Sequence, residues 1–428
     1  MVYFYMDRFI MLSMNYTYLT GKRIILLGKT RALNIKEFET FLKQHNLDLV
    51  STFTQVPDIV IEGRLMNPYE QEWAVQWYEL GNVEFIPLEH IERWLCESIQ
   101  PQRVLMSLKL SKDQERLVDF LKNPYILDDF FLKLLELYDW KNEGLFDSDQ
   151  NRDVTAAIIG RFYKDLERNH NVQYAMSGLA HLIEKYGDEI LIDAISKLEP
   201  IKKALKANND PSLNGILDAI ALHPDTNPTV LNQLLSHRAM LLASREPLIL
   251  EKELLALSDI RIDEKLASNA TLSEEGFAYL LKHQSQLLAK YIKLTESRFK
   301  DLYPDMVHYL ASNISLTASM QKVLVEGKIE AVLRELASNP SLEENLKIQL
   351  LEEESLYPYL AKNPSLSSEE IEKICDFTKS DILDALASNL STPIDILYQL
   401  SLDRRFERKV KMNPAFGHYI QTHNIGWY

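Results

Sequence analysis

The stretch Leu336-Ala337-Ser338-Asn339-Pro340-Ser341-Leu342 decides how most of this chain folds. It returns as Leu360-Ala361-Lys362-Asn363-Pro364-Ser365-Leu366, and its first four residues return at 266–269 and 386–389. Self-similarity at such a period is typical of repeat proteins. One unit cannot bury its apolar face alone, so neighbouring units must stack.

Aligning the chain on this asparagine gives nine units whose centres are 22 to 26 residues apart. The centres are His223, Arg245, Asn269, Tyr291, Asn313, Asn339, Asn363, Asn389 and Asn413. An aliphatic residue lies three positions before every centre, and alanine lies two positions before eight of the nine, with Lys411 as the exception. We expect each alanine, Ala337 and Ala387 among them, to let neighbouring helices approach closely while the leucines fill the seam.

The turn chemistry predicts two helices in each unit. Asparagine tolerates left-handed backbone and is common at helix ends, so the first helix is expected to end at the centre. The second begins about four residues later at a capping residue, as at Ser273, Thr317 and Ser367, the last with Glu370 as a capping box. Thr392-Pro393 gives the same signal, with proline at the first helical position. We expect the repeated asparagine to be structural, with its amide bonding backbone groups at the helix ends in a ladder.

These positions resemble the leucine-rich repeat variant family, whose helical repeats have about this length and an LAxNP core. The resemblance covers residues 215–416 and implies a right-handed superhelix of alternating longer and shorter helices. The iron–sulfur cluster of the founding member is not expected here, because Cys96 and Cys375 are the only cysteines and a cluster needs about four ligands. We expect no cofactor.

Residues 21–100 show alternating patterns of strand and helix. Strands are expected at 23–27, 49–51, 59–62 and 84–86, and helices at 35–45, 68–80 and 88–99. This order predicts a small, mainly parallel sheet covered by helices. A generic Rossmann-like domain is one interpretation, although no GxGxxG motif marks a nucleotide site.

The order also resembles a BRCT domain, through Gly21-Lys22-Arg23, Gly28, Ala74, Trp94 and Ser98. The resemblance implies a core that includes Gly28 and Trp94. Phosphopeptide-binding members carry Ser or Thr before the glycine and Lys near the start of the second helix. Leu27 and Glu70-Gln71 occupy those places here, so we expect no phosphate binding.

The sequence outside residues 21–100 is expected to form three parts: an N-terminal extension at 1–20, a helical linker domain at 101–214, and repeats with a C-terminal cap at 215–428. Helices in the linker domain are expected at 112–121, 124–138, 153–166, 172–185 and 189–205. The loop 147–151 has the D-x-D-x-N rhythm of a calcium site. Arg152 and Ile158 replace the required Gly and Glu, so we expect a polar loop that caps the next helix. The predicted fold class is α+β multidomain: a small BRCT-like α/β domain, a helical region and an α-solenoid of about nine repeats.

Bulk composition bounds the function. The net charge of −15 repels phosphate backbones and argues against nonspecific nucleic-acid binding. Two cysteines fit a reducing compartment. No secretory signal or membrane span is expected, because Asp7-Arg8 interrupt the first apolar run and no window reaches about 18 apolar residues. We therefore expect a cytoplasmic protein that does not bind membranes, and no catalytic or metal-binding residues.

One cluster breaks the acidic pattern, namely Arg404, Arg405, Arg408, Lys409 and Lys411 in the last repeat. A polar cap, which terminal repeats need for solubility, is one interpretation. The other is an anion-binding end that contacts an acidic partner or nucleic acid.

Two classes of function follow. The first is a non-enzymatic scaffold or adaptor for protein partners, and the BRCT resemblance implies a role in bacterial DNA replication or repair. The second is a helical-repeat nucleic-acid enzyme of the glycosylase type. That class needs a basic concave surface with an acidic or aromatic residue within it.

Overall fold

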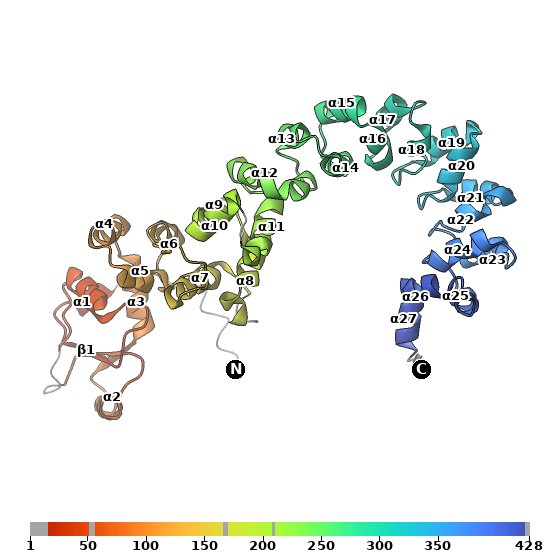
Figure 1. The fold of residues 1–428 in the computed structure, drawn as a ribbon. Coiled ribbons are helices and arrows are strands. Elements are labelled where there is room, and N and C mark those ends of the chain that lie inside the picture. The colour runs from red at the N-terminus through yellow and green to blue at the C-terminus, as the bar shows by residue number, and fades with distance from the viewer. Residues whose placement is uncertain (1–15, 51–55, 166–169, 208–209, 424–428) are drawn as a thin grey trace. The chain divides into compact units, whose positions relative to one another are not determined.

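The computed structural model describes residues 16–50, 56–165, 170–207 and 210–423. The chain divides into two compact units, Met1–His237 and Arg238–Tyr428. Helices α1 to α27 dominate the described residues, and one small parallel sheet lies near the N-terminus (Figure 1). The boundary between the units lies in α12 (Pro228–Ala243), which leaves helical geometry at Arg238. The repeat centred on His223 therefore belongs to the first unit.

The sheet consists of β1 (Ile24–Leu27), β2 (Ile59–Glu62) and β3 (Glu84–Pro87), which are parallel and lie in the order β1-β2-β3. α2 (Pro68–Leu80) packs through Trp77 on the face formed by Ile25, Leu27 and Val60. α1 (Ile35–Gln44) and α3 (Leu88–Glu97) contact each other and cover the other face (Figure 1). Near-continuous apolar strands are typical of a parallel sheet that is buried on both faces.

The strand expected at 49–51 is reduced to a single bridge. Leu49 pairs in parallel with Ile24, and the Val50 N–H donates to the Ile24 carbonyl at 2.8 Å. Ser51 lies outside the described residues. The bridge places this segment beside β1, on the edge opposite β2.

Helices follow from residue 101 to the end of the first unit. They are α4 (Pro101–Ser111), α5 (Gln114–Leu121), α6 (Asp128–Leu135), α7 (Asp149–Phe162), α8 (Met176–Tyr186), α9 (Glu189–Lys197), α10 (Glu199–Lys206) and α11 (Asn214–Leu222). The helix α4 was not expected from the sequence. The single helix expected at 189–205 is two helices, because Leu198 leaves helical geometry between them, with ψ 130°. α7 begins four residues earlier than expected, where Ser148 caps the Asn151 N–H, so the loop at 147–151 is a helix start.

The second unit is built from pairs of short helices. They are α13 (Glu251–Ala256), α14 (Ile260–Ser268), α15 (Glu274–His283), α16 (Ser285–Tyr291), α17 (Glu296–Leu302), α18 (Val307–Leu310), α19 (Ala318–Glu326), α20 (Glu330–Ala337), α21 (Glu344–Leu350), α22 (Tyr357–Leu360), α23 (Ser368–Ile374), α24 (Ser380–Ser388), α25 (Ile394–Ser401), α26 (Glu407–Met412) and α27 (Pro414–Thr422). The even-numbered helices from α14 to α26 each contact the next even-numbered helix. They line the inside of a curved arrangement, and the odd-numbered helices from α13 to α25 lie outside it (Figure 1). We name these seven even-numbered helices the inner row and the odd-numbered helices from α13 to α25 the outer row.

Alanines and the aliphatic residues before them form the buried seam of the repeats. The eight repeat alanines, Ala221, Ala243, Ala267, Ala289, Ala311, Ala337, Ala361 and Ala387, are all completely buried. The aliphatic residues one position earlier are 0–2 % exposed. Because protein interiors are close-packed, no space is left beside these alanines for a larger side chain.

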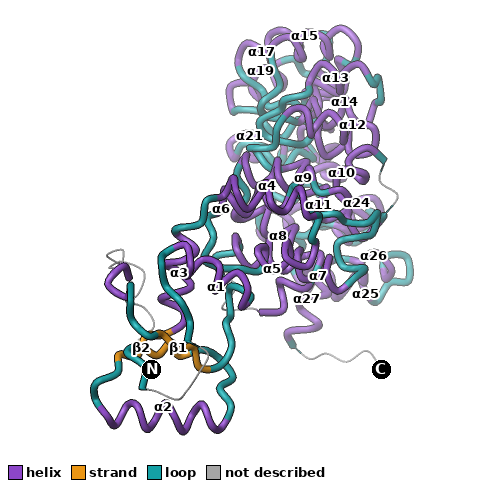
Figure 2. The backbone as a smooth tube through the Cα atoms, turned by 90° about the vertical axis from the view of Figure 1, so that its left-hand side faces the viewer, coloured by secondary structure: helices purple, strands orange, loops and turns teal. Residues whose placement is uncertain are grey.

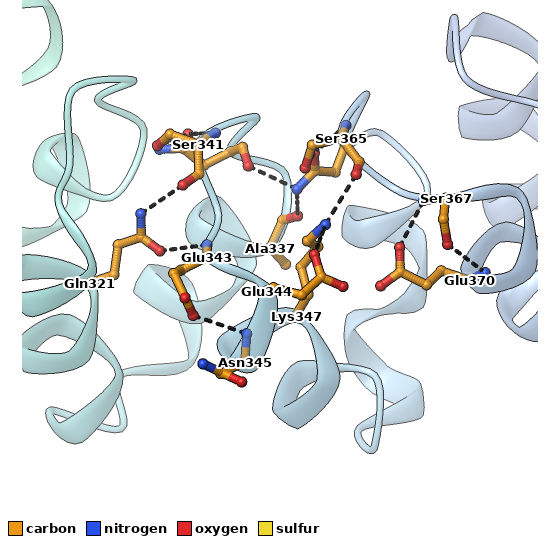
Figure 3. A network of polar contacts seen from close by, with 12 residues as sticks. Gln321, Ala337, Ser341, Glu343, Glu344, Asn345, Lys347, Ser365, Ser367 and Glu370 are labelled. Carbon is orange, nitrogen blue, oxygen red and sulfur yellow. Dashed lines mark hydrogen bonds and ion pairs between the residues drawn. The ribbon is translucent and has the colours of Figure 1, made fainter.

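A ladder of buried asparagine amides joins neighbouring repeats, with rungs at Asn269, Asn313, Asn339, Asn363, Asn389 and Asn413. Asn363 is typical: its amide donates to the carbonyls of Ala337 at 2.9 Å and Asn339 at 2.8 Å in the preceding repeat. Its Oδ1 accepts from the Ser365 N–H and hydroxyl within its own turn. The donors and acceptors of the Asn363 side chain are thus used where the helix ends leave backbone carbonyls without helical partners. Figure 3 labels two of its partners, Ala337 and Ser365.

The backbone of these asparagines differs from the expectation of left-handed geometry. Asn269, Asn389 and Asn413 have φ between −77° and −72°, with ψ between 118° and 129°. Asparagine is needed here for its side-chain amide, which both donates and accepts, and not for its tolerance of positive φ.

The repeat register shifts at Tyr291. The amide of Asn313 donates to Ala289 and to Ile292, which is completely buried, while Tyr291 remains half-exposed. One extra residue after Ala289 therefore moves the structural centre to Ile292.

Helix starts follow the predicted capping at three positions. Ser273 and Thr317 cap α15 and α19, and the predicted capping box of Ser367 with Glu370 is confirmed at α23 (Figure 3). Thr392 differs, because α25 begins at Ile394 and Pro393 precedes the helix. The buried Thr392 hydroxyl donates to the Leu386 carbonyl at 2.7 Å instead.

Candidate functional site

The basic cluster predicted at the end of the repeats lies on α26 and on the turn before it. Arg404 and Arg405 are in that turn, and Arg408, Lys409 and Lys411 are on the helix. All five side chains are exposed. The structure therefore gathers the predicted residues in one region.

Acidic neighbours compensate three of the five charges. Arg405 pairs with Asp403 at 2.7 Å, Lys409 with Asp384 at 2.5 Å, and Lys411 with Glu407 at 2.6 Å. The Arg405 hydrogen bonds lower the pKa of Asp403, and the Lys411 hydrogen bond lowers the pKa of Glu407. Asp384 belongs to the preceding repeat, so one of these pairs also joins two repeats.

Within residues 210–423, Arg404 and Arg408 are the members of the cluster whose side chains form no ion pair or hydrogen bond. Two exposed cations beside compensated pairs fit a polar cap. They also leave a small anion-binding surface.

Reversing Arg404 and Arg408 to glutamate tests these two interpretations. If duplex DNA binds here, its affinity should fall with salt with a log–log slope near −0.9 per phosphate contacted, and the double reversal should abolish binding. Melting should change little, because each exposed charge on a helix surface contributes only about 0.5 kcal/mol or less. Filter binding across a salt series measures the affinity and its salt dependence, and thermal unfolding followed by circular dichroism measures the melting. We expect no DNA binding by the parent protein even at low salt. If the parent does bind DNA, retained affinity in the reversed variant would contradict the assignment of that binding to these arginines.

A second candidate surface is the outward face of the inner row. Counted from Asn269, Asn313, Asn339, Asn363 and Asn413, the residues at positions −1, −4, −5 and −8 are at least partly exposed and have the spacing of one helical face. At Asn389, position −4 is the buried Ala385. In the middle of the row this face bears Tyr309, which is 38 % exposed, and Tyr359. Arg334 of α20 lies over the Tyr359 ring at 5.5 Å, and Lys362 lies at 5.3 Å from its centroid. We name Tyr309, Arg334, Tyr359 and Lys362 the aromatic–cationic patch.

This patch was not predicted from the sequence. Its signal was present in the register, because the buried positions −2 and −3 define which neighbours face outward. Cation–π contacts between successive repeats hold Tyr359 in place and leave part of its ring exposed.

The charge of the inner row is balanced. Its seven helices, all within residues 260–412, carry seven acidic and seven basic side chains. A surface for nonspecific binding of nucleic acid is instead expected to carry clustered positive charge.

In the N-terminal domain, the groups at the places expected to hold phosphate in a phosphopeptide-binding BRCT domain make contacts within the fold. Leu27 is completely buried, and its carbonyl accepts the Gly63 N–H at 2.8 Å. The Lys29 N–H donates to the Arg64 carbonyl at 2.6 Å. Glu70 is used in the capping box of α2 with Asn67. These groups are engaged within the fold.

A buried carboxylate accepts hydrogen bonds from three successive backbone N–H groups that follow β1. Glu92 is completely buried, and its Oε1 accepts from the N–H groups of Arg31, Ala32 and Leu33 at 2.9, 2.8 and 3.1 Å. Successive N–H groups of this kind form an anion-binding concavity. Here the chain supplies its own anion.

We therefore expect no preference for phosphorylated over plain peptides. Calorimetric titration of the full chain with matched phosphoserine and serine peptides measures this. The carboxylates of Glu92 and Glu70 repel a phosphate group, which carries about −1.5 to −2 charge at neutral pH. Phosphate-dependent binding that disappears in a Lys29→Ala variant would contradict the expectation.

Gly28 and Trp94, the two residues expected in the core by resemblance to BRCT domains, have different roles. Gly28 has φ +80°, and a Cβ there would lie 2.5 Å from the Arg64 carbonyl oxygen, so this turn requires glycine. Trp94 is half-buried and contacts Tyr16 and His45, with ring centroids 5.6 and 4.3 Å away. Burial lowers the pKa of His45, and its Nε2 lies 2.8 Å from the Ser98 hydroxyl.

The described residues contain no group of three His, Cys, Asp or Glu side chains that could hold a metal ion. Burial raises the pKa of the Cys96 thiol to about 12, and that of the Cys375 thiol is also raised by burial. Such thiols are protonated and weakly nucleophilic at neutral pH. Nor does any helix of the described residues have the length and apolar character needed to cross a bilayer.

No family model matches the chain, and no curated protein or solved structure matches it.

Proposed function

We propose that this protein is a non-enzymatic scaffold that binds a protein partner along the inner row of its repeats. The observation that carries this proposal is the separation of roles within each repeat. The positions −2 and −3 and the asparagine rungs hold the fold together, while the outward positions carry different side chains from one repeat to the next. Stacked repeats with variable outward positions provide extended binding surfaces.

The aromatic–cationic patch is the centre of the proposed surface. Tyrosine and arginine are enriched at the residues that contribute most to protein–protein binding. Arg334 is held by Glu330 and by the Tyr359 ring, so less side-chain freedom is lost when a partner binds. The charge balance of the inner row fits a mixed polar and apolar partner.

The repeat architecture is proposed to be an α-solenoid like that of the leucine-rich repeat variant family. Contacts between successive even-numbered helices, buried alanines and the asparagine ladder support this. The alternation expected of that family is matched only in part, since α18 and α22 have four residues whereas α20 has eight and α24 nine.

The N-terminal domain is proposed to be BRCT-like and to bind a second partner. The parallel order of a Leu49 bridge, β1, β2 and β3, with α2 on one face and α1 and α3 on the other, supports this proposal. In bacteria, such domains occur mostly in replication and repair proteins. A cytoplasmic adaptor in DNA replication or repair is therefore the proposed role.

The alternative is a helical-repeat enzyme acting on nucleic acid. Exposed tyrosines on the inner row are the observation in its favour, because bases stack on aromatic rings. The equal numbers of acidic and basic residues on the same row disfavour it.

Affinity purification of the full chain from its native cell, followed by mass spectrometry, tests the proposal. A variant with Arg334→Ala and Tyr359→Ala should lose specific partners. Tyr398→Ala, which removes a tyrosine that is 59 % exposed on α25 of the outer row, serves as the control and should retain them. An identical set of partners for all three proteins would contradict binding at the inner row.

A further inference from the structure

The helix α4 exposes apolar and basic side chains on the same face. Met106 is 59 % exposed and Leu110 is 78 % exposed, one helical turn apart. Arg103 lies one turn before Met106, and Lys109 lies beside Leu110. Val104 and Leu108 on the opposite side are buried and attach the helix to the domain.

The charge of α4 is opposite to that of the chain as a whole. The helix contains Arg103 and Lys109 and no acidic residue, in a chain of net charge −15. Within the first unit as described, neither side chain forms an ion pair, and both are exposed. Two unpaired cations around two exposed apolar residues fit a partner helix of acidic and apolar character.

The same chain carries a helix of that character in α2. Its outward face bears Glu72, Val75 and Glu79, all exposed, and Val75 is 59 % exposed. Tyr69 and Leu80 lie beside this face and are 72 % and 56 % exposed. Neither glutamate forms an ion pair among the described residues.

The charged residues on the two helices have matching spacing. At 1.5 Å per residue, Arg103 and Lys109 are about 9 Å apart along α4, and Glu72 and Glu79 are about 10 Å apart along α2. An antiparallel pairing therefore places Arg103 against Glu79 and Lys109 against Glu72. Met106 and Leu110 then face Val75 and its apolar neighbours.

This pairing is not made within one copy. α2 lies against the sheet and α4 against α6, at separate places on the first unit in both views (Figures 1 and 2). We propose that a second copy of this chain is the occupant, with α2 of one copy docked on α4 of the other. This inference stands on residues that the proposed function does not use.

A second copy fits these faces better than a membrane or nucleic acid. Stable membrane binding needs more buried apolar surface than two side chains provide, and the net charge is repelled by anionic lipid. A phosphate backbone would meet Met106 and Leu110 between the cations. At physiological salt the overall repulsion between two acidic copies is screened beyond about 8 Å, whereas contacts within the pairing are not.

Charge reversal on each helix tests the proposal in the full chain. One variant carries Arg103→Glu and Lys109→Glu, and a second carries Glu72→Lys and Glu79→Lys. Light scattering and sedimentation velocity over a concentration series measure the mass. The parent protein should self-associate, and each variant alone should associate at least about tenfold more weakly, because like charges then face each other. An equimolar mixture of the two variants should regain association, since opposite charges meet again in both contacts.

The mixture is also the control for folding, because variants that failed to fold would not associate when mixed. A third variant, Lys133→Glu and Lys185→Glu, changes the net charge as the first does at exposed positions elsewhere and should associate like the parent. A parent protein that stays monomeric at its highest soluble concentration overturns the proposal. So does association that survives either reversal, or a mixture that does not recover. Binding of a monomeric parent to phosphatidylserine vesicles would assign α4 to a lipid surface and equally overturn it.

Discussion

Replacing Asn363 by aspartate should destabilise the second unit by more than about 3 kcal/mol at neutral pH. The Asn363 side chain is completely buried and donates to the carbonyls of Ala337 and Asn339. A carboxylate cannot donate, so both carbonyl oxygens would face a buried negative charge. Each buried polar group that loses its partner costs about 1–3 kcal/mol, and charge adds to this.

The same substitution should make stability depend on pH. Burial beside two carbonyl oxygens would raise the pKa of the new carboxyl above its unfolded value of about 3.9. A group whose pKa is higher in the folded state than in the unfolded state loses its contribution as pH rises through the folded value. A protonated carboxyl has one O–H and can replace only one of the two hydrogen bonds that the amide donates, so Asn363→Asp should still be less stable than the parent near pH 4. The difference in stability should then grow towards neutral pH.

Denaturant unfolding at several pH values measures both effects, with Asn345→Asp as the matched control. Asn345 is exposed in the first turn of the nearby α21 (Figure 3), where an acidic side chain is favourable to the helix dipole. This control should stay within about 0.5 kcal/mol of the parent. Equal unfolding midpoints for Asn363→Asp and Asn345→Asp would refute the assignment of Asn363 to a buried rung.

The sequence predicts the seam of the repeats well because the physics is local and periodic. Leu336, Ala337 and Asn339 recur at positions where a helix face and a helix end must meet the next unit, and one register identifies all three. The backbone conformation of the asparagines was not predictable in the same way. Asparagine is compatible with left-handed geometry, and only the contact with the preceding carbonyls shows why extended geometry is used.

Features that depend on insertion or on the neighbouring repeat were not predictable. To predict the shift of the repeat centre from Tyr291 to Ile292, one must know where in the turn the extra residue lies. The ion pair of Lys409 with Asp384 joins residues 25 positions apart on adjacent repeats. The cationic character of the last repeat is visible in the sequence, but its compensation depends on which acidic side chains lie within reach.

The exposed faces of α2 and α4 illustrate the same limit. Met106 and Leu110 have the spacing of an apolar helical face, which by pattern alone indicates burial. The structure buries Val104 and Leu108 instead. Which of two apolar stripes packs inward is decided by the neighbouring helix, here α6.

Replacing Ala337 by leucine should destabilise the second unit by about 1–3 kcal/mol through overpacking. Ala337 has no exposed surface, and its carbonyl accepts the amide of Asn363 from the next repeat. A larger side chain must push α20 away from a neighbouring helix of the inner row. The buried seam and the hydrogen bond of the rung are then strained together.

The matched control is Ala331→Leu on the same helix, where Ala331 is exposed. Alanine and leucine have similar helix propensities, so the two substitutions differ mainly in what surrounds the new side chain. Because the chain has two compact units, unfolding is expected in more than one step, and only the step of the second unit should move. Differential scanning calorimetry separates these steps. Ala337→Leu should lower the melting temperature of that step and Ala331→Leu should not; if both melt like the parent protein, the seam lies elsewhere and the repeat register is wrong.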